Sequence, residues 1–240
     1  MAKLCLSVVG VAAAIAPPCY AQQAGDWQIG AGWFHIVPQD SSKPLVLTSP
    51  VMATLPGSGA DVQSSDTVGL NLTYFIDGNW AVEGVMGVPP RFKLNGTGTL
   101  EPAAELGSAR QWSPTLLVKH YFNDSTAKLR PFVGVGATYT WYTDVEVSAN
   151  MQAVFAGLLN VPPSALTTSA KLGASFAPVF NLGLAYQFDP RWGIVFSVSY
   201  IPIKTKAKLT TSVGSGAIVT SEASLKVNPL VPYLSVTYKF

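Results

Sequence analysis

The sequence predicts an all-β fold, an eight-stranded antiparallel transmembrane β-barrel with short periplasmic turns and long extracellular loops. Three observations predict it. Apolar and polar residues alternate over segments of about ten residues, as the lipid and lumen faces of a membrane strand require. The connections between these segments are alternately short and long. Only 12% of the 240 residues are charged and 48% are hydrophobic, yet no later stretch reaches the roughly 18 consecutive apolar residues of a membrane-spanning helix.

The N-terminal segment has the features of a secretory signal peptide. A basic residue precedes an apolar run at 4–16 that is too short to span a membrane, and small residues occupy the cleavage positions. We expect cleavage near Ala21, which makes residues 1–21 the signal peptide and residues 22–240 the barrel. Cys5 and Cys19 both fall in the removed segment, so thiol catalysis and disulfides are excluded from the mature chain.

Eight segments carry the alternation. In the fifth, Val133, Val135 and Ala137 alternate with Gly134 and Gly136, which places the two sets on opposite faces of a strand. The predicted strands cover residues 27–37, 67–76, 80–88, 115–122, 130–142, 177–188, 192–203 and 230–240.

The connections distinguish a barrel from a soluble β-sandwich. Those at 77–79, 123–129 and 189–191 are short, and those at 38–66, 90–112, 143–176 and 204–229 are long. A sandwich explains the alternation but not this asymmetry. It also leaves unexplained the aromatic residues at strand ends, which are typical of interfacial girdles. Within the third long loop, residues 149–159 are predicted to form a short amphipathic helix.

The last strand places Val236, Tyr238 and Phe240 on the face directed to lipid. A terminal aromatic of this kind is similar to the signal that barrel-assembly machinery recognises, so these three residues are expected to contact it.

The residues that could carry chemistry are few. His35 and His120 lie on different strands, without metal-ligand spacing or a presented nucleophile, so we interpret them as polar interfacial residues. Asp61 and Asp66 lack the spacing of a cation loop. Without Lys3 the chain has 14 basic and 13 acidic side chains, a balance that does not indicate a nucleic-acid partner. The sequence predicts no enzyme activity, no cofactor and no metal.

Several motifs resemble the outer-membrane protein W family. They are the stretch Asp77–Glu83, then Pro114–Leu116 with Tyr121–Phe122, then Leu129–Gly136, and the terminal Tyr238–Phe240. Within the family, Gly87–Lys93 and Tyr200–Thr205 resemble the AlkL-like branch that imports alkanes and similar hydrophobic compounds. The resemblance covers Gly25 to Phe240 and implies a location in the outer membrane of a Gram-negative bacterium. The long third loop departs from the family pattern.

Two functional classes fit this fold. The first is a narrow passive conduit for small hydrophobic molecules, since an eight-stranded barrel is filled by side chains or holds one small ligand. The second is a structural, adhesive or receptor barrel without transport, whose long loops contact host, phage or lipopolysaccharide. The strands alone leave the two nearly equal. The resemblance and the apolar loops favour the conduit.

The inward faces predict a lumen plug near the periplasmic end. Glu83, Lys119, Arg130 and Lys239 all fall on inward faces, and charges in a narrow lumen are expected to pair. In the alternative arrangement, Lys119 extends outward to the interface.

The fourth long loop and its flanks are basic. Lys204, Lys206 and Lys208 alternate on one face, and Lys226 lies on the returning segment, which indicates contact with lipopolysaccharide phosphates. The alternative is an ordinary solvated face.

If the lumen is plugged, a hydrophobic ligand needs a lateral exit into the membrane. Phe34, Ile36 and Phe92 are candidates for lining its pocket. Proline cannot donate to a strand ladder, and the candidate exit positions are therefore Pro38, Pro89, Pro90 and Pro202. In the alternative interpretation, these prolines only end strands and protect the rim.

Overall fold

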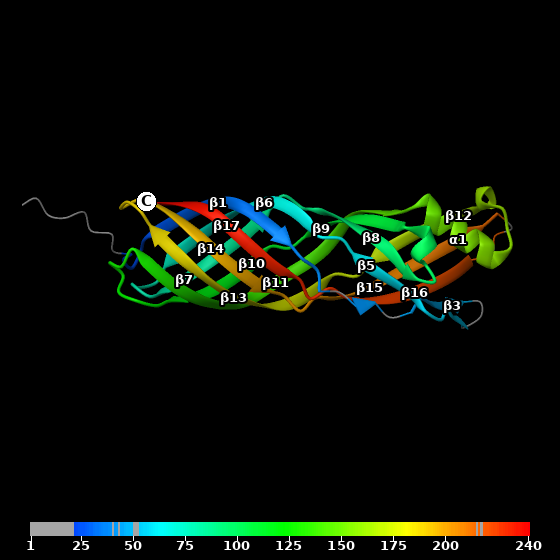
Figure 1. The fold of residues 1–240 in the computed structure, drawn as a ribbon, viewed down its shortest axis with the longest axis horizontal. Coiled ribbons are helices and arrows are strands. Elements are labelled where there is room, and N and C mark those ends of the chain that lie inside the picture. Colours follow the sequence, from blue (N-terminus) through cyan, green and yellow to red (C-terminus); the bar gives the residue numbers. More distant parts are fainter. Residues whose placement is uncertain (1–21, 40, 43, 50–52, 215, 217) are drawn as a thin grey trace, which may run out of the picture.

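The computed structural model describes residues 22–39, 41–42, 44–49, 53–214, 216 and 218–240. The predicted signal peptide, with Cys5 and Cys19, lies outside these residues. The described chain forms a long cylinder (Figure 1). One half contains the short turns and the C-terminus, and the other contains further strands and a helix.

The first half is a closed antiparallel barrel, which confirms the predicted fold. Its strands are β1 (Trp27–Ile36), β6 (Ser65–Phe75), β7 (Trp80–Gly87), β10 (Thr115–Tyr121), β11 (Leu129–Val147), β13 (Ser175–Gln187), β14 (Trp192–Tyr200) and β17 (Leu230–Lys239). Each pairs with its neighbour in the chain order of these eight strands, and β10 also pairs with β11. The barrel closes where β1 meets β17, with Ala31 opposite Val236.

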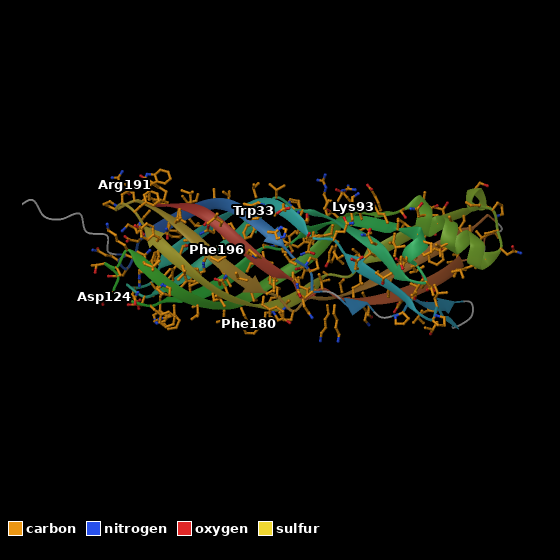
Figure 2. The ribbon with its side chains drawn as sticks, in the orientation of Figure 1. Trp33, Lys93, Asp124, Phe180, Arg191 and Phe196 are labelled. Atoms are coloured by element: carbon orange, nitrogen blue, oxygen red, sulfur yellow. The ribbon has the colours of Figure 1, made fainter. Side chains whose placement is uncertain are left out.

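The barrel wall has one apolar and one mixed face. Trp33, Phe180 and Phe196 point away from the wall (Figure 2), and each leaves 47–52% of its surface exposed. Polar side chains such as Asn71 and Ser235 are buried on the lumen side. A strand alternates its side chains between faces, so this is the pattern of a wall between lipid and an enclosed interior.

Two of the short turns are held by the same pattern of hydrogen bonds from the backbone to an aspartate side chain. Asp77 Oδ1 accepts from the backbone N–H groups of Asn79 and Trp80, both at 2.7 Å. Asp189 Oδ1 accepts in the same way from Arg191 and Trp192. An aspartate that bonds to the backbone two and three residues later favours a tight turn. The Asp-x-x-Trp spacing therefore fixes both hairpins at the periplasmic end.

The long connections are largely strands, which corrects their prediction as loops. They contain β2 (Ser41–Ser42), β3 (Val46–Ser49), β4 (Ala53–Thr54), β5 (Ser58–Val62), β8 (Arg91–Gly98), β9 (Glu105–Trp112), β12 (Leu166–Leu172), β15 (Lys204–Val213) and β16 (Ile218–Lys226), with short 3-10 turns at Glu101–Ala103 and Pro163–Ala165. These strands continue the barrel outward as an extension.

The extension consists of two sheets. The β9 sheet runs in the order β5-β8-β9 and joins the outer half of β11, so it continues the barrel's own hydrogen-bonded sheet. The β15 sheet runs in the order β12-β15-β16-β3-β4, with β2 also on β16, and forms a separate six-stranded sheet.

Helix α1 (Ala149–Leu159) lies at the far end of the extension (Figure 1). Its bounds match the predicted residues, and the Ser148 hydroxyl caps it by accepting from the Met151 N–H at 3.1 Å. Met151 and Phe155 are buried against both sheets, in a cluster with Leu106 and Leu209. The helix is only weakly amphipathic, because the residues on its exposed side include Ala149, Ala153 and Gly157 and none of them is charged. No helix among the described residues is long and apolar enough to cross a membrane.

Candidate functional site

A buried ion pair lies in the inner half of the lumen. Lys119 Nζ is 2.5 Å from Glu83 Oε1, and the two side chains are 3% and 6% exposed. The other carboxylate oxygen accepts from Asn71 Nδ2 at 3.1 Å and from the Thr73 hydroxyl at 2.9 Å. Lys119 Nζ also lies 4.4 Å from the centre of the Phe132 ring. Both charges are thus paired and further bonded, as burial in a narrow lumen requires.

Aromatic side chains fill the lumen between this pair and the short turns. Phe75, Tyr121 and Phe132 pack with ring centroids 5.4 and 5.1 Å apart, and all three are at most 2% exposed. Ala81 and Ala185 complete the cluster. The periplasmic end of the barrel is therefore closed by packed rings as well as by charges.

The other two residues of the predicted plug have different partners. Arg130 is buried under the Tyr121 ring, donates to the Gly78 carbonyl at 2.6 Å and bonds to the Gln22 side chain. Lys239 Nζ lies 3.4 Å from Asp26 Oδ2. Neither is in the Glu83–Lys119 network, because both lie closer to the turns than the expected common level.

A single tyrosine joins the polar network to the lumen above it. The Tyr233 hydroxyl donates to Asn71 Oδ1 at 2.9 Å. Its ring stacks on Phe34 with centroids 3.9 Å apart and planes 11° apart. An aromatic floor thus covers the polar plug.

The lumen pocket, a cavity of about 110 Å³, lies over this floor. Phe34, Ile36 and Tyr233 line it, and Glu83 reaches it from below. Its wall also includes hydroxyl and amide side chains, namely Thr67, Ser113, Thr115, Asn181, Ser197 and Ser199.

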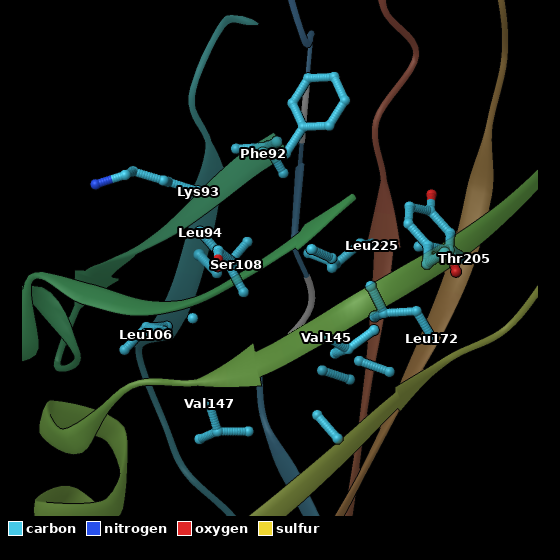
Figure 3. A pocket seen from close by; sticks show the side chains of 18 of the residues that line it. Phe92, Lys93, Leu94, Leu106, Ser108, Val145, Val147, Leu172, Thr205 and Leu225 are labelled. Carbon is cyan, nitrogen blue, oxygen red and sulfur yellow. The ribbon is translucent and has the colours of Figure 1, made fainter. Parts of the chain in front are cut away.

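The outer pocket, a cavity of about 150 Å³, lies inside the extension between the two sheets. Aliphatic side chains dominate its wall (Figure 3), and they include Leu94, Leu106, Val145, Val147, Leu172 and Leu225. Lys93 points away from the cavity (Figure 3) and pairs with Glu105 at 2.9 Å. Tyr142 also lines the pocket, and burial raises its pKa to about 12, so the hydroxyl stays neutral at ordinary pH.

The two pockets adjoin at a neck. Ile36, Gln111 and Pro229 belong to the walls of both cavities. The Gln111 amide donates at 2.9 Å to the hydroxyl of Ser113, which lies in the short segment between β9 and β10. Of the predicted ligand residues, the structure places Phe34 in the lumen pocket, Phe92 in the outer pocket and Ile36 at the neck.

The ladder is interrupted at Pro89 and Pro90. The pairing of β7 with β10 ends at Val85 opposite Thr115, and it resumes only where the Gln111 N–H donates to the Pro90 carbonyl at 3.1 Å. The lumen pocket reaches this interruption, because its lining includes Met86 and Val88, whose side chains are 57% and 60% exposed on the outside.

A second interruption lies near Pro202. The pairing of β13 with β14 ends at Phe180 opposite Tyr200, and pairing with β15 resumes at Gly173. Here Ile203 is 1% exposed and packs on Ala177, so an aliphatic side chain fills the space.

Around Pro38 the backbone stays bonded. Val37 exchanges two hydrogen bonds with Leu230, and the Gln39 N–H donates to the Val227 carbonyl at 2.9 Å.

The predicted lysines share one outer face. Lys204, Lys206 and Lys208 point outward from β15, and Lys226 lies opposite Lys204 on β16. Lys171 on β12 joins them opposite Lys208.

The histidines lie on the outer surface, at different ends of the membrane wall. His35 Nδ1 is 2.8 Å from Asp66 Oδ1, in a pair that is largely exposed. His120 packs between Trp80 and Phe122 at the periplasmic girdle. Among the described residues, no group of three or more His, Cys, Asp or Glu side chains could hold a metal ion.

Sequence reasoning missed Asn71, Tyr233 and Gln111. The parity of β6 and β17 could have marked Asn71 and Tyr233 as inward, because each is flanked by lipid-facing residues. Gln111 and Lys171 fall in connections that were predicted as loops, so no strand parity was assigned to them.

The closed barrel, the lipid-facing wall and the plugged lumen define an outer-membrane β-barrel of a Gram-negative bacterium. Residues 23–240 match the OmpW family, and the chain belongs to that family.

Individual relatives agree with this assignment. The chain is 30% identical to outer membrane protein W of Vibrio cholerae over 231 residues, covering 96% of this chain and 95% of that one. It is 26% identical to outer membrane protein AlkL of Ectopseudomonas oleovorans over 186 residues, with 78% and 71% covered. It is 24% identical to the dibenzothiophene metabolism operon protein PahQ of Pseudomonas aeruginosa over 228 residues, with 94% and 93% covered. The crystal structure of OprG from Pseudomonas aeruginosa superposes with a TM-score of 0.78 at 28% identity, covering 92% of this chain and 98% of that one.

Proposed function

We propose that this barrel is a passive conduit for small hydrophobic molecules, which enter from the extracellular side and leave laterally into the membrane. One observation carries the proposal. Two adjoining cavities, the outer one walled by aliphatic side chains, lead inward to a lumen that is closed by a buried ion pair.

The outer pocket supplies the attraction for such a ligand. Transfer of apolar surface from water into an aliphatic cavity is favourable by roughly 25 cal/mol per Å². Sites for small molecules are mostly apolar, with a few polar groups that fix orientation. Gln111 at the neck and Tyr142 in the wall are the polar groups best placed for that role.

The plug makes an axial path to the periplasm unfavourable. Passage would require separation of Glu83 from Lys119 and displacement of the Tyr121 and Phe132 rings. An unpaired charge in such a site costs several kcal/mol. A hydrophobic molecule gains nothing from that route, whereas the lipid beside the wall is a favourable destination.

The interruption at Pro89 and Pro90 is the best-supported exit. The lining of the lumen pocket includes Met86 and Val88 at this interruption, and both residues are exposed. The interruption near Pro202 is closed by Ile203, and the backbone around Pro38 keeps its hydrogen bonds. We therefore assign the exit to the first of these positions.

The name of one relative supports the ligand class. PahQ is named for a dibenzothiophene metabolism operon, and dibenzothiophene is a small hydrophobic compound.

Assembly of the barrel gives its last strand a further role. Val236 on β17 and Phe240 just after it are 49% and 66% exposed. We propose that they, with Tyr238, are recognised by barrel-assembly machinery. Deletion of Phe240 should lower the amount of folded protein in the outer membrane, and unchanged folded protein would contradict this role.

A cross-link over the exit tests the lateral path. Val88→Cys and Ser113→Cys stand on opposite sides of the interruption, and both positions line the lumen pocket. A short bis-maleimide that joins them should abolish uptake of a labelled medium-chain alkane by cells.

The matched control is Ser199→Cys with Val231→Cys, a pair that lines the same pocket on an uninterrupted ladder. Its cross-linking should leave most of the uptake. Equal uptake by both cross-linked proteins would exclude the exit at Pro89. Equal uptake by cells with and without the wild-type chain would exclude the conduit itself.

A further inference from the structure

The outer face of the β15 sheet carries a cluster of positive charge. Lys204 lies opposite Lys226, and Lys171 lies opposite Lys208. Lys206 stands between these two rows on β15. Like charges directly opposite each other on a sheet repel. Such an arrangement is unfavourable unless an anion lies over it.

The chain itself supplies little compensation. Among the described residues on this face, the one acidic partner of these lysines is Glu222, whose Oε1 lies 3.3 Å from Lys208 Nζ. Both side chains of that pair are exposed, at 68% and 42%, so solvent weakens it. Among the described residues, these five lysines therefore share one carboxylate.

The β9 sheet on the same extension is different. Its basic residues are each paired, Arg91 with Glu146 at 2.9 Å, Lys93 with Glu105 at 2.9 Å, and Arg110 with Asp144 at 3.3 Å. Between the two described sheets, the excess of positive charge thus lies on the β15 sheet. It is not a general property of the extracellular surface.

The charged rows lie at the end of the β15 sheet nearest the membrane. Lys204 follows Tyr200, the last residue of β14, by four positions. At about 3.3 Å per residue, that is about 13 Å along the chain. The next outward rows on β15 are Thr210 and Ser212, which carry no charge. The charged rows therefore begin close to the end of β14, and Lys208 lies four residues beyond Lys204 on β15.

We propose that the five lysines Lys171, Lys204, Lys206, Lys208 and Lys226 form a binding face for the phosphates of lipopolysaccharide. The outer leaflet that surrounds the barrel presents such phosphates beside the inner end of this face. Each ammonium group offers three donors to phosphate oxygens. The bound phosphates offset the repulsion between the opposed lysines and hold the β15 sheet at the membrane surface.

The test measures lipid A binding to the purified, folded full-length barrel in neutral detergent. The variant Lys204→Ser/Lys206→Ser/Lys208→Ser removes the three lysines of β15. It should bind bisphosphorylated lipid A at least tenfold more weakly than the wild type does. The wild type should also bind monophosphoryl lipid A more weakly, and added NaCl should weaken its binding further.

The matched control is Arg91→Ser/Lys93→Ser/Arg110→Ser, which removes three positive charges from the β9 sheet. It should retain lipid A binding. Heat-modifiable migration on gels shows that each variant is folded, and a variant that fails this check is replaced by Lys204→Ser/Lys226→Ser.

Equal losses in the two triple variants would overturn the proposal. The proposal would also be overturned if the wild type bound bisphosphorylated and monophosphoryl lipid A equally well. Binding of a sulfated polysaccharide without binding of lipid A would overturn it in favour of an extracellular polysaccharide. None of these outcomes depends on uptake, so the conduit is tested separately.

Discussion

The Phe34 ring lies 3.9 Å from the Tyr233 ring, and the Tyr233 hydroxyl donates to Asn71 Oδ1 at 2.9 Å. Tyr233→Phe keeps the stack but leaves the oxygen of a side chain that is 3% exposed without its donor. The free energy of unfolding should fall by about 1–3 kcal/mol, measured by urea titration in lipid vesicles. Tyr139→Phe on the lipid face is the control, and an equal loss there would contradict the role of the hydroxyl.

Breaking the Glu83–Lys119 ion pair should lower the free energy of unfolding more than Tyr233→Phe does. Lys119→Met leaves the Glu83 carboxylate buried without its cation, so the free energy of unfolding should fall by about 3–5 kcal/mol. Adding Glu83→Gln removes the stranded charge and keeps an oxygen that can accept from Asn71 and Thr73. The double variant should therefore be more stable than Lys119→Met alone. If it is less stable, the pair is not the source of the loss.

The turn that contains Asp77 should make the stability of the barrel depend on pH. Hydrogen bonds from the backbone N–H groups of Asn79 and Trp80 hold the pKa of Asp77 below its ordinary value of 3.8. A carboxyl with a depressed pKa stabilises the fold above its unfolded pKa, and this stability is lost as the pH falls through the folded value. Asp77→Asn should therefore be less stable than the wild type at pH 7. The gap should narrow below about pH 4, and a constant gap would refute the charge effect.

Filling the outer pocket tests the path. Ala170 and Ala223 line that cavity and are only partly buried. Ala170→Phe/Ala223→Phe should reduce uptake of a labelled alkane at least tenfold, because the added rings occupy the cavity. Ala137→Phe on the outer face of β11 is the control for added bulk. Unchanged uptake by the filled variant would place the path outside this pocket.

Helix α1 should stabilise the extension without supporting the barrel. Phe155 is fully buried in the cluster at the far end. Phe155→Ala should cost about 3–5 kcal/mol locally, seen as faster proteolysis within the extension. Cleavage in the barrel strands should not change, because the ladder there is intact. Faster cleavage in both parts would show that they unfold together.

The sequence predicted the membrane strands closely because lipid demands one apolar side chain at every second position. The strands of the extension obey the same alternation, as Phe92 and Leu94 show, but water replaces lipid outside them. Their outward residues are therefore lysines, threonines and serines, a pattern that resembles a loop. The membrane strands and the extension strands therefore differ in what lies outside them, which is lipid for the first and water for the second.

The inward-facing residues of the candidate site could be predicted from the alternation along each strand, but their positions along the barrel axis could not. Parity on a strand assigns a side chain to a face, and it placed Glu83 and Lys119 inside the barrel. It does not give height, which depends on strand tilt and register across the ladder. Arg130 and Lys239 were therefore placed too far from the turns, and Phe34 and Phe92 were assigned to one pocket although each lines a different one.

Along β15 and β12, alternate residues face the cavity and the outside, so substitutions at outward positions can occur without changing the cavity wall. Residues such as Ala207 and Leu172 face the outer pocket, whereas their immediate neighbours face the surroundings of the cell. The tip formed by α1 stands furthest from the membrane and is the part that an antibody or a phage meets first. Substitutions selected there, or on the outward positions of the strands, leave the wall of the cavity as it was. The outer surface of the extension can therefore change while the wall of the cavity stays the same.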